Sequence, residues 1–168
     1  AENVDISYLI EYQIDKTDRT FVYVYLFEKC ILKTEKKMKI EIWSDIACPF
    51  CYIGKRHFEK ALMQFADKEK IEVEWKSYLL DPDYVYQPES PETEAEYISR
   101  RKGISIDEAR QMFTSITRMA SMAGLNYDFD KVIVANTLDA HKIIQKAKEK
   151  NRGDEAEERF FKAFFVDG

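Results

Sequence analysis

The amino-acid sequence predicts an α/β fold in which a strand–helix–strand unit is followed by a block of helices. Three observations support this prediction. An alternating apolar segment begins at Met38, an amphipathic helix pattern begins at Pro49, and the patterned segments after Pro91 have helical periodicity or helix caps. The chain has 168 residues, of which 45% are hydrophobic and 34% charged. This composition is typical of an ordinary globular protein.

Residues 1–37 differ in character from the rest of the chain. They contain an aromatic, β-like run at Phe21–Phe27 and a lysine-rich stretch at Lys33–Lys37. We interpret Met38 as the natural start of the domain and residues 1–37 as an extension. The alternative is an additional strand that pairs with an exposed sheet edge, which the β-propensity of the run favours.

The strand–helix–strand unit is expected within residues 38–82. A strand over about 38–45 precedes a helix over about 49–67, and a second strand begins at Ile71 and reaches residue 80 before Asp81-Pro82 ends it. The apolar stripe of the helix consists of Phe50, Ile53, Phe58, Leu62 and Phe65.

Four side chains of this unit have an expected environment. Trp43 and Trp75 are predicted to pack in the core of the sheet. Lys55 and Arg56 are predicted to lie on a solvated face of the helix. The alternative for the two basic residues is that they add positive potential near the start of the helix.

Residues 83–91 form a proline-rich loop, and residues 92–168 are predicted to be helical. Ser105 to Glu108 is a capping box, and Gly103 and Gly124 mark helix ends. Asn136 or Thr137 is expected to begin the third helix. The four expected helices cover about 93–101, 105–123, 137–150 and 153–165.

Composition argues against several functional classes. A net charge of −5 argues against a nucleic-acid surface, and the longest apolar run has seven residues, against the roughly 20 that span a membrane. Three cysteines are too few for a disulfide-stapled framework. The start at Ala1 lacks the basic-then-apolar pattern of a signal peptide, so a cytoplasmic location is expected.

The most informative motif is Cys48-Pro49-Phe50-Cys51, which lies between the first strand and the helix. Two thiols at this spacing, at the point where a strand leads into a helix, are typical of redox chemistry. The start of a helix carries unpaired N–H groups and partial positive charge, which favour a thiolate at Cys48. Cys51 lies one turn further along and can resolve a mixed disulfide formed at Cys48.

Other interpretations of these residues are weaker. The motif could be half of a zinc site, but such sites need a second pair of ligands at suitable spacing, and Cys30 and His57 could only be forced into that role. Cys30 is expected to be a free thiol without a role. Asp45, three residues before Cys48, could shuttle a proton, but its expected role is to accept backbone hydrogen bonds at the end of the strand.

Four ordered blocks resemble one protein family. The segment Lys39–Arg56, which contains the two cysteines, resembles the active-site segment of DsbA-family oxidoreductases of the FrnE-like branch. Leu79–Pro82, Gly124–Asp130 and Ala135–His141 are similar to further segments of that branch. The resemblance covers Met38 to Gly168 and does not include residues 1–37.

This resemblance implies a thioredoxin-like fold that is interrupted by an all-helical insertion. It also implies dithiol–disulfide exchange with protein or small thiol substrates, with Cys48 as the attacking and Cys51 as the resolving cysteine. No metal or organic cofactor is expected, although glutathione could serve as a co-substrate. Asn136 and His141 are candidates to line the cleft above the cysteines.

The chain also departs from the family pattern. Such proteins carry a cis-proline loop that faces the two cysteines, whereas the last proline here is Pro91. The later strands are therefore expected beyond Gly168, which leaves the sheet incomplete on its C-terminal side and the chain truncated. Copies of the chain could then associate through the open sheet. Two alternative functions stay open: a glutathione transferase or isomerase of the same fold, and an inactive fragment or sheet-completing module.

Overall fold

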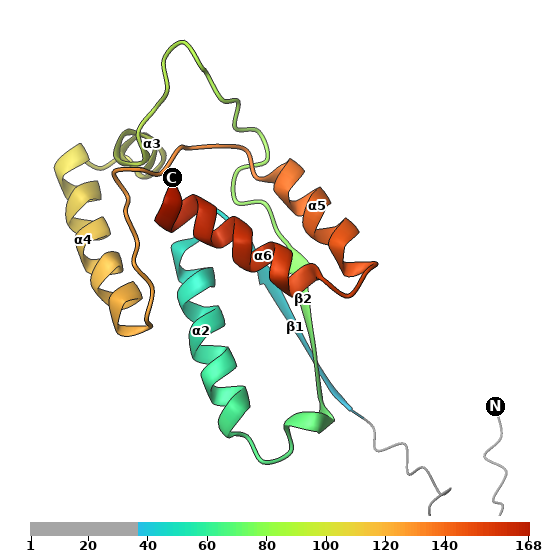
Figure 1. The fold of residues 1–168 in the computed structure, drawn as a ribbon. Helices are drawn as coiled ribbons and strands as arrows, with labels where there is room; N and C mark the ends of the chain where they lie inside the picture. The colour runs from blue at the N-terminus through green and yellow to red at the C-terminus, as the bar shows by residue number, and fades with distance from the viewer. Residues whose placement is uncertain (1–36) are drawn as a thin grey trace, which may run out of the picture. The chain divides into compact units, whose positions relative to one another are not determined.

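The structure is a computed structural model, in which residues 37–168 are described (Figure 1). Strands β1 (Met38–Ser44) and β2 (Ile71–Ser77) form a two-stranded parallel sheet in which Met38 pairs with Ile71 and Ser44 with Ser77. Helix α2 (Pro49–Gln64) and the short 3-10 helix η3 (Lys68–Lys70) connect them. This arrangement confirms the predicted strand–helix–strand unit.

Both C-terminal boundaries in this unit come earlier than predicted. The helix ends at Gln64 because Phe65 has an extended backbone. The second strand ends at Ser77, where the ladder with β1 also ends. Beyond it the Leu80 N–H donates to the Asp45 carboxylate at 2.6 Å instead of to a neighbouring strand.

The helical block follows the predicted order. It consists of α3 (Glu94–Lys102), α4 (Ile106–Met122), α5 (Leu138–Lys148), α6 (Gly153–Lys162) and the terminal π-helix η4 (Ala163–Asp167). Capping boxes begin α3 and α4, with Thr93 paired to Glu96 and Ser105 to Glu108. Gly103 ends α3 at φ 66°, a conformation that favours glycine. The Ser105 box and the helix end at Gly103 lie where the sequence predicts them, whereas the Thr93 box was not predicted.

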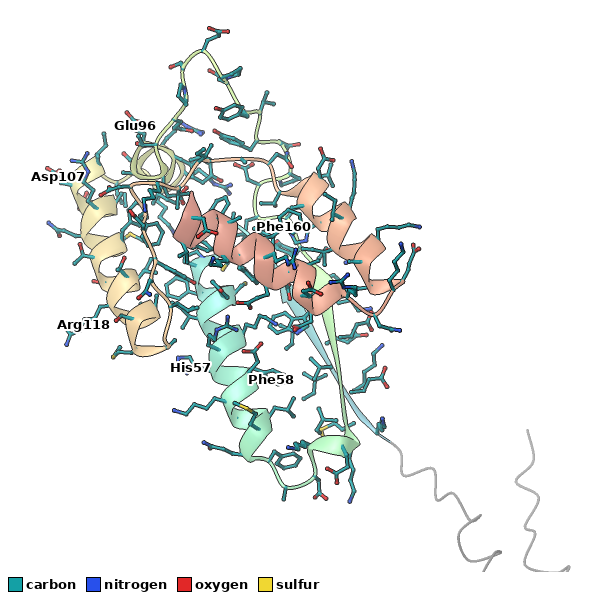
Figure 2. The ribbon with its side chains drawn as sticks, viewed as in Figure 1. His57, Phe58, Glu96, Asp107, Arg118 and Phe160 are labelled. Carbon is teal, nitrogen blue, oxygen red and sulfur yellow. The ribbon has the colours of Figure 1, made fainter. Side chains whose placement is uncertain are left out.

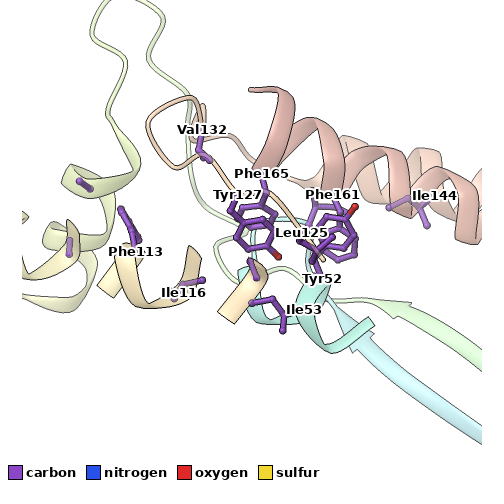
Figure 3. Packing of buried hydrophobic residues seen from close by; sticks show 14 residues of the cluster. Tyr52, Ile53, Phe113, Ile116, Leu125, Tyr127, Val132, Ile144, Phe161 and Phe165 are labelled. Carbon is purple, nitrogen blue, oxygen red and sulfur yellow. The ribbon is translucent and has the colours of Figure 1, made fainter. Parts of the chain in front are cut away.

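The core between α2 and the helical block is aromatic (Figure 3). Tyr52 of α2 stacks on Phe161 of α6 with ring centroids 4.8 Å apart, and Tyr127 stacks on Phe165 at 4.6 Å. Stacked aromatic rings at these separations add to the stability that burial provides. The helix that carries the two cysteines is therefore anchored to α6 and to the segment before α5.

The prediction that Trp43 packs in the sheet core is wrong, because its side chain is 63% exposed. Trp43 lies on the same face of β1 as Lys39 and Glu41, which are also exposed. Trp75 is half-buried and contacts Phe58 edge-on at 6.5 Å.

The prediction that Lys55 is solvated is also wrong, because only 1% of it is exposed. Its ammonium group pairs with Glu59 at 3.0 Å and with Asp154 at the start of α6. Arg56 is half-buried and pairs with Glu158 of α6. Asp154 and Glu158 of α6 thus lie against α2, where Lys55 is buried and Arg56 half-buried.

Two sequence predictions fall on residues that the structure does not describe. Those for Cys30 and for the strand-like run at Phe21–Phe27 lie outside the described residues. Within residues 37–168, no helix is both long enough and apolar enough to cross a membrane.

Candidate active site

The two cysteines lie at the N-terminal end of α2, where the backbone is well ordered by hydrogen bonds. Cys48 is the N-cap residue and Pro49 the first residue of the helix. The Cys48 N–H donates to the Asp45 carbonyl and the Cys51 N–H to the Cys48 carbonyl, each at 3.0 Å. The Tyr127 hydroxyl donates to the Pro49 carbonyl at 2.7 Å, which ties this turn to the helical block. Both cysteines are free thiols and half-buried.

The two sulfur-bearing residues differ in their surroundings. Cys48 lines a pocket at the start of α2. Cys51 is not among the residues that line this pocket and packs against the hydrophobic core. A substrate in the pocket therefore meets Cys48 first, with Cys51 behind it.

The two thiols titrate together. The hydrogen bond between them lowers the pKa of Cys51 to about 6. The same bond, together with burial, raises the pKa of Cys48, and the backbone N–H groups of Cys51 and Phe50 only partly offset this. The start of the helix alone would predict the low pKa at Cys48. It falls on Cys51 instead, because the first thiolate is stabilised by the remaining S–H of its partner.

A buried polar group lies behind Cys51. The Ser44 hydroxyl is close enough to Cys51 and to Glu157 to lower the pKa of each, although it makes no hydrogen bond of ordinary geometry. Glu157 is buried, one of its carboxyl oxygens has no hydrogen-bond partner, and burial raises its pKa to about 7 despite the Lys55 charge nearby. The resolving cysteine therefore has an acid that can hold a proton near neutral pH in its vicinity.

Asp45 has the role that its sequence position predicts. It is buried and accepts hydrogen bonds from the Ala47 N–H at 3.2 Å and the Leu80 N–H at 2.6 Å. Two side chains of the helical block join these donors, the Thr137 hydroxyl at 2.7 Å and the His141 Nε2 at 3.2 Å. Because a carboxylate only accepts, the His141 proton must lie on Nε2. Burial favours a higher pKa for Asp45, but the four donors outweigh it and lower the pKa below its ordinary value.

The three cleft candidates thus separate. Asp45 lines the pocket, and His141 lies behind it as a buried donor. Asn136 is not among the residues that line this pocket. Its amide donates to the Pro82 and Tyr84 carbonyls at 2.9 and 3.0 Å, and it holds the proline-rich loop against the start of α5.

The pocket beside Cys48 has a volume of about 360 Å³ and a largely apolar wall. Phe50, between the two cysteines, lines it and is 54% exposed. The apolar side chains from the helical block that line it are Ile98, Met112, Phe113, Ile116, Phe129, Val134 and Phe164. This size and this lining are typical of sites that bind a small ligand or a side chain.

Glu94, the first residue of α3, lines the same pocket and was not predicted from the sequence. Only 6% of it is exposed, and its carboxyl group has no hydrogen bond or ion pair with any described residue. Burial, followed by the nearby Glu92 charge, raises its pKa to about 7. Its place after the capping residue Thr93 was visible in the sequence, but its burial in the pocket was not.

No group of three or more potential ligands among residues 37–168 is arranged to hold a metal ion. His57, which the zinc interpretation needed, lies midway along α2, away from the end that carries the cysteines (Figure 2).

A family model and a solved structure both relate this chain to DsbA. The model of the family described as DSBA-like thioredoxin domain matches residues 39–168. The uncharacterized protein YwbO of Bacillus subtilis (strain 168) is 33% identical over 129 residues, which are 75% of this chain and 56% of that protein. The crystal structure of a probable DsbA oxidoreductase from Streptomyces coelicolor matches with a TM-score of 0.70 and 32% identity, over 77% of this chain and 54% of that one. The chain spans about half the length of these relatives.

Proposed function

The chain belongs to the family of DSBA-like thioredoxin domains, and from this membership we propose that it exchanges disulfides with thiol substrates through Cys48 and Cys51. The membership confirms the predicted thioredoxin-like fold with its helical block. The observation that carries the proposal is the position of the two thiols. Cys48 faces a pocket at the start of a helix, and Cys51 lies one turn behind it.

The proposed reaction has two exchange steps. The shared proton moves to Cys51, and the Cys48 thiolate attacks one sulfur of a substrate disulfide, which forms a mixed disulfide and releases the first substrate thiolate. Cys51 then loses its proton and attacks the Cys48 sulfur. This step releases the second substrate thiolate and leaves a Cys48–Cys51 disulfide, so two electrons have passed to the substrate. The reverse sequence oxidises a dithiol, and the reduction potential decides between the directions.

Glu157 and Ser44 support the second step. A buried acid with a pKa of about 7 can accept the proton that Cys51 must lose through the Ser44 hydroxyl, which interacts with both groups. We propose that the substrates are proteins or small thiols, with glutathione as a co-substrate, and that the reaction uses neither a metal nor an organic cofactor. We also propose that the chain belongs to the FrnE-like branch and that its location is cytoplasmic.

Three variants test the proposal through insulin reduction and glutathione-coupled exchange. Cys48→Ser is expected to abolish both reactions. Cys51→Ala is expected to accumulate a mixed disulfide at Cys48, which mass spectrometry detects. Cys30→Ser is the matched control and should retain activity. Turnover that persists in Cys48→Ser would refute the proposal, and full glutathione-dependent turnover in Cys51→Ala would favour a transferase or isomerase instead.

The titration of the thiol pair is a further test. The rate of alkylation by iodoacetamide should rise with pH around a midpoint near 6, because the pair loses its first proton there. A midpoint near the ordinary value of 9.0 would contradict the proposed activation.

A further inference from the structure

We propose that the pocket beside Cys48 binds a cationic side chain of a polypeptide disulfide substrate, with Glu94 as the residue that pairs with the positive charge. This inference rests on the proposed function and names the substrate class of the same site. Such a pocket selects substrates that carry a lysine or arginine next to the cysteine that reacts.

Glu94 is a buried acid without a hydrogen-bond or ion-pair partner among the described residues. Glu94 is 6% exposed as a residue and lines the pocket, yet its carboxyl group has no partner among residues 37–168. Buried ionisable groups in folded proteins are normally paired, since an unpaired buried charge is costly. A ligand that brings a cation would remove this cost, and a charge-assisted hydrogen bond would form in its place.

The charged residues that line the pocket differ in whether they already have partners. Asp45, Asp81 and Glu94 are the acids that line it, and Arg101 and Lys102 are its basic residues. Arg101 already pairs with Asp81 at 2.7 Å. Asp45 is saturated by its four donors. Glu94 is therefore the lining acid whose charge is left for a ligand.

The wall of the pocket between Cys48 and Glu94 suits the aliphatic stem of a basic side chain. The pocket joins the attacking residue to the carboxyl group, and its lining is mostly aromatic and aliphatic. The aliphatic stem of lysine or arginine packs well on such a wall while its charged end reaches a polar partner. A purely apolar side chain would leave Glu94 unpaired, and an acidic one would be repelled.

The test uses two short peptides that differ only in the residue before their single cysteine. One carries lysine and the other norleucine, which has an unbranched aliphatic side chain without the amine. The cysteine is activated as a disulfide with thiopyridine. In the Cys51→Ala chain, Cys48 attacks the peptide sulfur, the bond to thiopyridine breaks, and thiopyridone leaves with the electron pair. Its absorbance reports the rate.

At about pH 8, above the pKa of Glu94, the lysine peptide should react about tenfold faster than the norleucine peptide, a ratio typical of one partly buried charge pair. Adding Glu94→Gln should reduce this ratio to about one. Adding Glu92→Gln instead is the matched control, because Glu92 does not line the pocket and bonds Arg100, and should preserve the ratio. An unchanged ratio in the Glu94→Gln chain would overturn the inference.

A binding measurement separates this inference from the proposed function. Fluorescently labelled peptides with serine in place of cysteine cannot exchange, and their affinity for the full chain is measured by anisotropy. The lysine peptide should bind about tenfold more tightly than the norleucine peptide, and Glu94→Gln should abolish the difference. If this holds while neither activated peptide reacts with Cys48, the pocket assignment stands and the oxidoreductase proposal fails. Equal binding of the two peptides would refute the pocket assignment.

Discussion

Asp45 and Glu94 both line the pocket beside Cys48, and the surroundings of their carboxyl groups are opposite. Asp45, at the end of β1, accepts four hydrogen bonds, and its pKa is lowered although burial opposes this. Glu94, at the start of α3, accepts none from the described residues, and burial raises its pKa to about 7. Burial alone therefore does not decide the charge of an acid, because the hydrogen-bond donors around the carboxyl group also shift its pKa.

The two groups therefore have different roles. Asp45 connects three parts of the fold through its donors: the turn before Cys48, the segment after β2 and helix α5. It is an anchor that positions the start of α2. Glu94 connects nothing among the described residues, so its retention in a buried position lowers stability and leaves it available to a ligand.

The largest expected effect comes from Asp45→Ala. The change leaves the Leu80 N–H, the Thr137 hydroxyl and the His141 ring without their acceptor, and we expect a loss of roughly 3–5 kcal/mol in the free energy of unfolding. Urea denaturation measures this loss. The matched control is Asp83→Ala, an exposed acid of the proline-rich loop, which should change stability by about 0.5 kcal/mol or less. Equal effects at the two positions would contradict the anchor role.

The pH dependence of this contribution has a defined sign. The folded-state pKa of Asp45 lies below its ordinary value of 3.8, so its stabilising effect is complete above that value and is lost as pH falls through the folded-state pKa. The stability difference between the wild-type chain and Asp45→Ala should therefore shrink only below about pH 4.

The next largest effect has the opposite sign. The folded-state pKa of Glu94 is raised from 4.5 to about 7, so the folded chain keeps a proton that the unfolded chain loses. Stability should therefore fall as pH rises through this interval, by about 2–3 kcal/mol. Glu94→Gln should remove this loss, so the variant is more stable than the wild-type chain at about pH 8 and similar to it near pH 4.

Denaturation at the two pH values measures this difference. Glu157 has a similarly raised pKa, so it accounts for the pH dependence that stays in the variant. Glu89→Gln, at an exposed position of the loop, serves as the control and should follow the wild-type profile. A Glu94→Gln chain that is less stable than the wild-type chain at about pH 8 would show that Glu94 has a partner.

The sequence predicted the features that depend on neighbouring residues. A capping box needs two residues three positions apart, and the predicted box at Ser105 and Glu108 is present where it was expected. The same holds for Cys48 at the start of α2 and for the backbone donors of Asp45. Such signals can be recognised without knowledge of the tertiary contacts.

Features that depend on distant residues could not be predicted in this way. The burial of Lys55 results from its pairing with Asp154, 99 positions along the chain, and Thr137 reaches Asp45 across 92 positions. The isolation of Glu94 is harder still to predict, because it depends on partners that are missing from its surroundings. The exposure of Trp43 likewise depends on which elements cover β1.

The smallest effect is expected from removing one hydrogen-bond donor of Asp45. Thr137→Val preserves the shape of the side chain but removes the hydroxyl that donates to Asp45 at 2.7 Å. Three donors stay in place, so we expect a loss of about 1–2 kcal/mol and a pKa of Asp45 that moves upward toward its ordinary value. Thr114→Val is the control, since its hydroxyl donates to the Arg110 carbonyl on the exposed surface of α4. If the two variants lose equal stability and the acid limb of the profile does not move, the four donors do not act on Asp45 as a set.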